Sequence, residues 1–167
     1  LERICTNFGS ENIAACIVEP IAGSTGTLVP PKGYLKRLRE ICDKHGILLI
    51  FDEVITGWGR TGSAFAAQEW NVKPDIMTMA KATTNGVVPM GVVAVKEEIY
   101  DAVLDGSSAP EGTPELFHGY TYSGIPVAVA AALAVQDIFD KEDIFKRAKE
   151  MSPYLQDGLQ SLKDLKE

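Results

Sequence analysis

The sequence predicts an α/β fold with a mostly parallel sheet flanked by helices. Short apolar runs of strand length alternate with amphipathic stretches of helical period, and turns rich in Gly and Pro separate them. The run ILLIF at residues 47–51 has no polar face, which is typical of a central parallel strand covered by helices on either side. The resulting order, strand-helix-strand-helix-strand-strand-helix, favours α/β architecture.

The predicted elements follow one another closely along the chain. Apolar runs predict strands at residues 13–18, 47–51, 76–79 and 91–95. Helical patterns predict helices at residues 31–45, 63–70, 96–104 and 126–139, and a last, more polar helix from residue 140. Polar loops are expected at residues 21–31 and 105–113.

Single residues indicate where some helices begin and end. Gly46 is placed to supply the C-cap of the helix that ends at His45. Asp140 is predicted to cap the start of the last helix. Pro153 lies inside that helix and is expected to kink or break it.

Composition limits the classes of protein to which the chain can belong. The chain has 167 residues, 46% hydrophobic and 23% charged, as expected for one soluble globular domain with a real core. The net charge of -7 argues against nucleic acid and anionic membrane surfaces as partners. No apolar run approaches the roughly 20 residues that span a bilayer.

The three cysteines and the absence of a signal peptide favour the cytoplasm. Cys5, Cys16 and Cys42 are odd in number and are not spaced like metal ligands. Buried thiols in a reducing compartment explain them, and we expect no metal site.

Both ends of the sequence look cut. Leu1 is not an initiator methionine, and an apolar stripe runs almost to the last residue, through Leu155, Leu159, Leu162 and Leu165. We therefore expect a fragment of a longer chain.

Polar residues stand directly after the apolar strands, where ligands collect in open α/β sheets. They are Glu19, the pair Asp52-Glu53, and Lys81. For Asp52, a carboxylate that only caps the next turn is an equally good explanation. A lysine is ordinarily a solvated surface residue, which is the alternative for Lys81. Because Lys81 follows a buried strand and precedes a polar segment, we expect a desolvated amine of lowered pKa that is suited to a Schiff base.

Asp52 and Lys81 together favour pyridoxal phosphate as cofactor. This cofactor needs a lysine amine and a carboxylate against its pyridine nitrogen. The segment Gly57–Gly62 also matches G-x-G-x-x-G. A dinucleotide site, however, needs the first glycine at the strand end and an acid ending the next strand, and neither is found here. We interpret this segment as a turn.

Four segments resemble the signature of class III (fold type I) pyridoxal-phosphate-dependent aminotransferases, and the similarity covers nearly the whole chain. They are Glu19-Pro20-Ile21, the run IFDEVITGWGRTG at residues 50–62, PDIMTMAK at residues 74–81, and FHGYTYSG at residues 117–124. Ala67, Pro89-Met90-Gly91 and the last segment look closest to the omega-amino acid–pyruvate (beta-alanine–pyruvate) branch.

The resemblance implies a role for each of several residues. Lys81 is then the Schiff-base lysine and Asp52 the partner of the pyridine nitrogen. Val54 and Ile55 match positions that pack on the face of the cofactor ring. The resemblance also implies a role for a further pair, Tyr120 and Thr121.

Tyr120 and Thr121 match a segment that reaches across a dimer interface to the partner's cofactor phosphate. A Thr hydroxyl and free N–H groups before a helix suit an anion, although Thr121 as a helix N-cap explains the pattern equally well. Glu19 matches a strand-end glutamate lining the active site, with a loop-holding role as the alternative. Arg60 is expected to tie down the glycine turn, and His118 to pack or hydrogen-bond.

The resemblance also implies a domain organisation and an activity. Residues 1–139 match part of the cofactor-binding large domain, and residues 140–167 a helix leading towards a truncated small C-terminal domain. The expected reaction moves an amino group from an amine or omega-amino acid to a 2-oxo acid such as pyruvate, in a homodimer.

Two other functions stay open on the sequence alone. One is an aminomutase or racemase on the same scaffold, and the other is a non-catalytic fragment. The segments that hold the cofactor phosphate within one subunit are missing from these residues, so we expect the isolated chain to be inactive.

Overall fold

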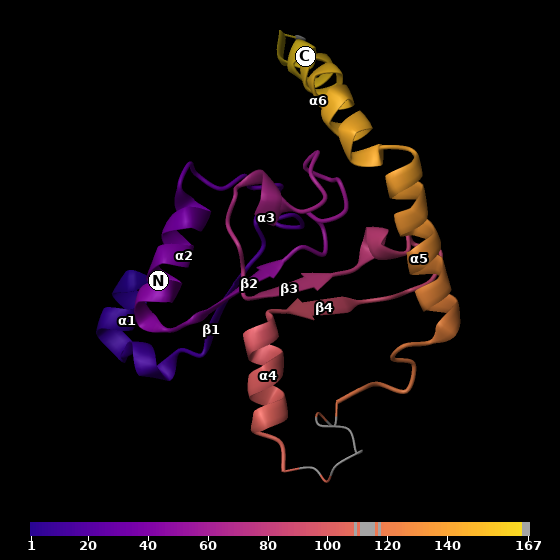
Figure 1. The fold of residues 1–167 in the computed structure, drawn as a ribbon. Coiled ribbons are helices and arrows are strands. Elements are labelled where there is room, and N and C mark those ends of the chain that lie inside the picture. Colours follow the sequence, from indigo (N-terminus) through magenta and orange to yellow (C-terminus); the bar gives the residue numbers. More distant parts are fainter. Residues whose placement is uncertain (109, 111–115, 117, 165–167) are drawn as a thin grey trace.

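A four-stranded sheet forms the centre of the computed structural model, which describes residues 1–108, 110, 116 and 118–164 (Figure 1). The strand order is β1-β2-β3-β4, with β1 at Ala15–Val18, β2 at Leu48–Asp52, β3 at Ile76–Met79 and β4 at Val92–Val95. β1, β2 and β3 run parallel, and β4 is antiparallel to β3. The predicted α/β fold with a mostly parallel sheet is confirmed.

The helices connect and flank these strands. They are α1 (Glu2–Phe8), α2 (Tyr34–His45), α3 (Ala66–Glu69), α4 (Glu97–Asp105), α5 (Pro126–Lys141) and α6 (Ile144–Gln160), with 3-10 turns η1 (Ser10–Asn12), η2 (Lys81–Thr83) and η3 (Ser161–Asp164). Sequence patterns missed α1, while the other helices lie where they were predicted to within a few residues. Among the described residues, no helix combines the length and apolar character needed to cross a bilayer.

The core lies between α2 and one face of the sheet. Leu35, Leu38 and Ile41 occupy one side of α2 and pack with Leu49 and Phe51 of β2. Both β2 side chains are fully buried. Gly46 ends α2 in the left-handed conformation at φ 66°, so the predicted C-cap is confirmed.

The opposite face of β2 is less covered than its sequence predicted. Leu48 and Ile50 alternate with the buried residues and are only half-buried. The position of β2 as an inner strand of a mostly parallel sheet flanked by helices is confirmed, while the face that carries Leu48 and Ile50 is the less covered of the two. Apolar character alone cannot tell which neighbour covers a face.

An ion-pair network fixes the start of β3. This is the end of the strand that lies farther from Lys81. The buried carboxylate of Asp75 contacts Arg39 Nη1 at 2.6 Å and Lys96 Nζ at 2.5 Å, and accepts a hydrogen bond from the Leu49 N–H at 2.7 Å. Burial opposes the charge, but the hydrogen bonds from Lys96, Leu49 and Arg39 hold the pKa of Asp75 below its usual value. The network joins α2 and β2 to Lys96, the residue between β4 and α4.

We expect Asp75→Asn to lower the free energy of unfolding at pH 7 by about 2 kcal/mol or more, because it leaves two cations without their partner. The folded pKa of Asp75 lies below its unfolded value. The stabilisation is therefore complete above the ordinary pKa of an aspartate and is lost as the pH falls below it.

Urea unfolding at several pH values checks this prediction. Asp43→Asn is the matched control, because Asp43 also pairs with Arg39 but its side chain is 65% exposed. Removing such a surface pair costs less than about 1 kcal/mol. Equal losses in the two variants would contradict the structural role of Asp75.

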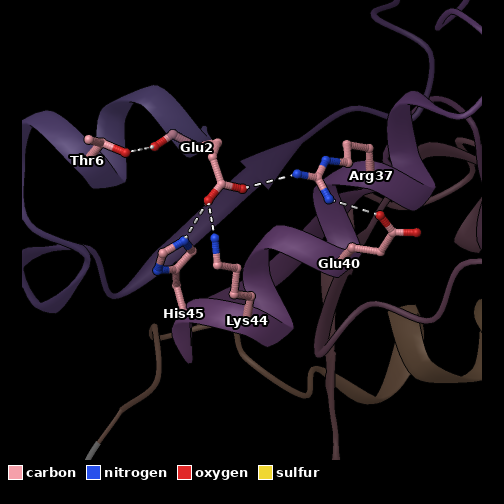
Figure 2. A network of polar contacts seen from close by, with 6 residues as sticks. All are labelled: Glu2, Thr6, Arg37, Glu40, Lys44 and His45. Carbon is pink, nitrogen blue, oxygen red and sulfur yellow. Dashed lines mark hydrogen bonds and ion pairs between the residues drawn. The ribbon is translucent and has the colours of Figure 1, made fainter.

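A polar network fastens α1 to α2 (Figure 2). The Glu2 carboxylate contacts Lys44 Nζ at 2.6 Å, His45 Nε2 at 3.1 Å and Arg37 Nη2 at 3.2 Å. The hydrogen bonds from Lys44 and then His45 lower the pKa of Glu2 to about 2. Because these partners lie 35 to 43 residues away, local sequence gives little sign of α1.

The C-terminal helices differ from prediction in where they meet. α5 continues through Asp140 to Lys141, so the prediction that Asp140 caps the last helix is wrong. α6 begins after Asp143, which has a left-handed φ of 48°. Pro153 lies inside α6 without ending it, and Leu165 of the predicted stripe lies outside the described residues.

Candidate active site

Asp52 and Lys81 follow neighbouring parallel strands at the same edge of the sheet. Asp52 is the last residue of β2 and pairs in register with Thr78 of β3. Lys81 lies three residues beyond Thr78, at the start of η2. The carboxyl ends of parallel strands are where α/β proteins place their ligands. This edge lies beside α5 in Figure 1.

Lys81 is exposed, so the expectation of a desolvated amine is wrong for these residues. The chain leaves the sheet after Met79, and the lysine starts the 3-10 turn outside the strand layer. Within the described part of the chain, its ammonium group takes part in no ion pair. Lys81 has a left-handed φ of 46°, a strained conformation that is concentrated at functional sites.

The half-buried Asp52 carboxylate is hydrogen-bonded on one oxygen. Its Oδ1 accepts the Val54 N–H at 3.0 Å, which is the turn-capping bond that the sequence left open as an alternative. Within the described residues, Oδ2 accepts no hydrogen bond and remains available. The capping bond therefore does not exclude a second partner.

Glu19 ties down the loop that follows β1. Its Oε2 accepts the Gly23 N–H at 2.9 Å, which is the loop-holding alternative considered from sequence. A Cβ at Gly23 would come within 2.5 Å of Ile55 Cδ1, so the loop packs closely on the end of the Ile55 side chain. Val54 and Ile55 are both half-buried.

Glu53 is a structural carboxylate whose role the sequence did not reveal. It is fully buried, and its oxygens accept hydrogen bonds from Thr56 Oγ1 at 2.7 Å and from the N–H groups of Ala66 at 2.9 Å and Ala67 at 2.8 Å. These bonds satisfy the first N–H groups of α3. The adjacent acids Asp52 and Glu53 thus have different environments.

The glycine segment after β2 is a turn, as predicted, and Trp58 packs from it into an aromatic cluster. The centroid of the Trp58 ring lies 5.0 Å from that of Phe65 and 5.8 Å from that of Phe139. The ring centroids of Phe139 and Phe145 are 5.1 Å apart. Trp58 is half-buried in this cluster. The expectation that Arg60 ties the turn down receives no support, because its side chain is exposed.

Tyr120 and Thr121 lie on an exposed turn before α5. The N-cap of α5 is Ile125, so the alternative that Thr121 caps this helix is wrong. The Ser123 hydroxyl accepts the Tyr120 N–H at 2.9 Å, and His118 meets the Tyr120 ring edge-on at 5.5 Å. No described contact brings this turn to Asp52 or Lys81, and Phe117 of the same motif lies outside the described residues.

Comparison with known proteins gives matches along the whole chain. The model of the family "Aminotransferase class-III" matches residues 1–167. An omega-aminotransferase of Caulobacter vibrioides is 58% identical over 164 residues, which are 98% of this chain and 37% of that protein. A beta-alanine–pyruvate aminotransferase of Pseudomonas aeruginosa is 52% identical over 157 residues, covering 94% of this chain and 35% of that protein.

Solved structures agree with these sequence matches. An (S)-enantioselective omega-transaminase from Thermomicrobium roseum has a TM-score of 0.90 and 44% identity, covering 98% of this chain and 35% of that chain. An amine transaminase from an uncultivated Pseudomonas species, solved in a PLP-bound form, has a TM-score of 0.89 and 44% identity, covering 98% and 36%. The chain spans about a third of the length of these relatives. With the sheet edge, the sequence motifs and these matches in agreement, the chain belongs to the class III aminotransferase family.

Proposed function

We propose that the complete protein transfers an amino group from an amine or omega-amino acid to a 2-oxo acid such as pyruvate, using pyridoxal phosphate. By the complete protein we mean these residues together with the regions that the relatives have outside the match. The observation that supports this most directly is the placement of Lys81 and Asp52 after adjacent parallel strands. The omega-aminotransferase and beta-alanine–pyruvate aminotransferase relatives support the choice of substrates.

The side chains at this edge fit the proposed cofactor chemically. Lys81 supplies an accessible primary amine, and Asp52 supplies a carboxylate oxygen that is free of intramolecular bonds within the described residues. Val54 and Ile55 add half-buried apolar surface next to Asp52, suited to the face of a planar ring. The set therefore offers one covalent attachment point, one ionic partner and one apolar surface.

Each of these residues has a distinct part in the proposed reaction. When bound, pyridoxal phosphate supplies a carbonyl that condenses with amines and a ring that withdraws electrons. Lys81 would hold the cofactor through its Nζ and, once its amine is free, would move a proton at the substrate Cα as a general base and acid. Asp52 keeps a proton on the pyridine nitrogen through a charge-assisted hydrogen bond.

A transamination assay on the complete protein tests the proposed function. With beta-alanine as donor and pyruvate as acceptor, we expect alanine to form in proportion to the donor consumed. An aminomutase or racemase would instead convert the amino compound without a 2-oxo acid. Absence of alanine with a panel of amines and omega-amino acids would contradict the proposal, and conversion without pyruvate would identify the alternative reaction.

We also propose that the active protein is a homodimer in which the Tyr120-Thr121 turn serves the site of the partner subunit. The turn is exposed, and no described contact joins it to Asp52 or Lys81 of its own chain. Its family match to a phosphate-contacting segment supports the assignment. We propose further that activity requires the regions of the relatives outside the match. We also propose a cytoplasmic location, which the three free cysteines support.

Hybrid dimers of inactive variants test the shared site. We expect Lys81→Ala and Thr121→Asp to be inactive alone, the second because its charge repels the cofactor phosphate. An equal mixture should regain roughly a quarter of wild-type activity, since half of the dimers are hybrids and each hybrid has one intact site of two.

The control mixture combines Lys81→Ala with Asp52→Asn. Both changes fall in the site of their own subunit, so hybrids of these two variants contain no intact site. Recovery in the control, or no recovery in the test mixture although subunits exchange, would contradict the assignment of Thr121 to the partner's site.

A further inference from the structure

We propose that Trp58 is a positioning residue that fixes the backbone turn at Lys81 through the Thr83 hydroxyl. The proposal rests on the proposed function, because it concerns the lysine that would hold the cofactor. It names a pair of residues, 25 positions apart in sequence, that the structure joins by a hydrogen bond.

The turn at Lys81 is held in an unfavourable conformation. The φ of Lys81 is 46°, in the left-handed region that a residue with a Cβ rarely adopts. Such a conformation persists only where surrounding contacts determine it. Within the turn, the N–H groups of Thr83 and Gly86 donate to the carbonyls of Ala80 and Lys81 at 3.0 and 3.2 Å.

The buried Thr83 side chain connects this turn to Trp58. Its hydroxyl donates to the Ala80 carbonyl at 3.0 Å and accepts the indole N–H of Trp58, also at 3.0 Å. The hydroxyl therefore uses its donor function within the turn and its acceptor function towards Trp58. A valine at this position would keep the shape but lose both bonds.

The Trp58 ring is itself packed against two other aromatic rings. Phe65 and Phe139 contact it, and Phe139 belongs to α5, which packs against η2. A Cβ at Gly59 would come within 2.7 Å of the Phe145 ring, so the backbone beside Trp58 is also tightly packed. The indole N–H thus reaches Thr83 from a rigid support.

From these contacts we infer how Trp58 acts on the reaction. It acts through Thr83, by restricting the backbone of residues 80–83 so that the Lys81 amine stays at one place on the sheet edge. Its loss should lower kcat more than it changes KM, because the amine acts in the chemical steps rather than in substrate binding.

Hydrogen exchange in the cofactor-free complete protein tests the first half of this proposal. Trp58→Phe keeps an aromatic ring without the N–H, and Thr83→Val removes the hydroxyl. We expect Trp58→Phe to speed amide exchange in residues 80–86 by about fivefold, and Thr83→Val to speed it at least as much, because valine also loses the bond to the Ala80 carbonyl. The double variant should exchange like Thr83→Val, because the bond between Trp58 and Thr83 is already lost in it. Thr83→Ser keeps the hydroxyl and should exchange like the wild type.

Trp70→Phe is the matched control, since Trp70 is the second of two tryptophans and packs against the α2 core. It should leave exchange in residues 80–86 unchanged. Wild-type exchange in Trp58→Phe and Thr83→Val would overturn the proposal.

The pH profile of the visible absorbance of bound pyridoxal phosphate tests the second half. We expect its midpoint to move by roughly half a pH unit in Trp58→Phe and Thr83→Val, and not in Thr83→Ser. Faster exchange with an unchanged midpoint and unchanged kcat would overturn the positioning role. If pyridoxal phosphate fails to attach to the wild type at all, the proposed function itself fails. That outcome is distinct from a negative result in the hydrogen-exchange test or in the absorbance test.

Discussion

Replacing Lys81 with alanine in the complete protein is expected to lower turnover by at least about a thousandfold, because it removes the general base and acid for proton movement at the substrate. The exposed amine of Lys81 is the group that would also attach the cofactor. Steady-state rates of alanine formation, together with the visible absorbance of the cofactor-loaded protein, measure both losses.

Two further variants distinguish the amine from general effects on the sheet edge. Lys81→Arg keeps the positive charge but cannot form the covalent attachment, and should be as inactive as Lys81→Ala. Lys73→Ala changes an exposed lysine just before β3, at the other end of the strand, and should retain activity. Substantial turnover in Lys81→Ala would rule out the assigned role.

Asp52→Asn should lower kcat by at least about a hundredfold while pyridoxal phosphate still attaches to Lys81. The amide cannot supply the negative charge that keeps the pyridine nitrogen protonated. It can still accept the Val54 N–H, so the turn after β2 should hold. Rates and cofactor loading on the same preparation separate the two effects.

Asp75→Asn is the control for Asp52→Asn, because it makes the same aspartate-to-asparagine change at a different place in the sheet. Asp75 precedes β3 at the far end of the sheet, and its carboxylate is committed to Arg39 and Lys96. This variant should unfold more easily yet keep its kcat under conditions where it is folded. A near-normal kcat in Asp52→Asn would exclude Asp52 from the reaction.

The features that sequence predicted well are those set by local pattern. The run that forms β2 is apolar without interruption, and Asp52 and Lys81 break the apolar pattern where their strands end. Since parallel strands share a carboxyl edge, these two breaks were enough to place both residues at one side of the sheet. The glycine segment was also predicted correctly, as a turn. That prediction rested on the number of residues between the end of the strand and the first glycine, which is read directly from the sequence.

The features that sequence missed depend on partners far along the chain. Helix α1 is fastened to α2 by Glu2, whose contacts lie 35 to 43 positions away. Asp52 and Glu53 are adjacent carboxylates, yet only Glu53 is fully buried, because the N–H groups of Ala66 and Ala67 meet it. Residue type gave no means of separating them.

Two incorrect predictions show where local signals compete. Asp140 and Asp143 are equally acceptable helix N-caps, and the break between α5 and α6 falls at the second of them. Lys81 follows an apolar strand and was expected to be desolvated, but it starts a turn that carries it out of the strand layer.

Identification of the lysine that carries the cofactor tests the central claim most directly. The complete protein is loaded with pyridoxal phosphate, reduced with borohydride, digested and analysed by mass spectrometry. The account predicts a pyridoxyl group on the peptide that contains Lys81, and its disappearance in Lys81→Ala. Stoichiometric labelling of another lysine, with Lys81 unmodified, would contradict it.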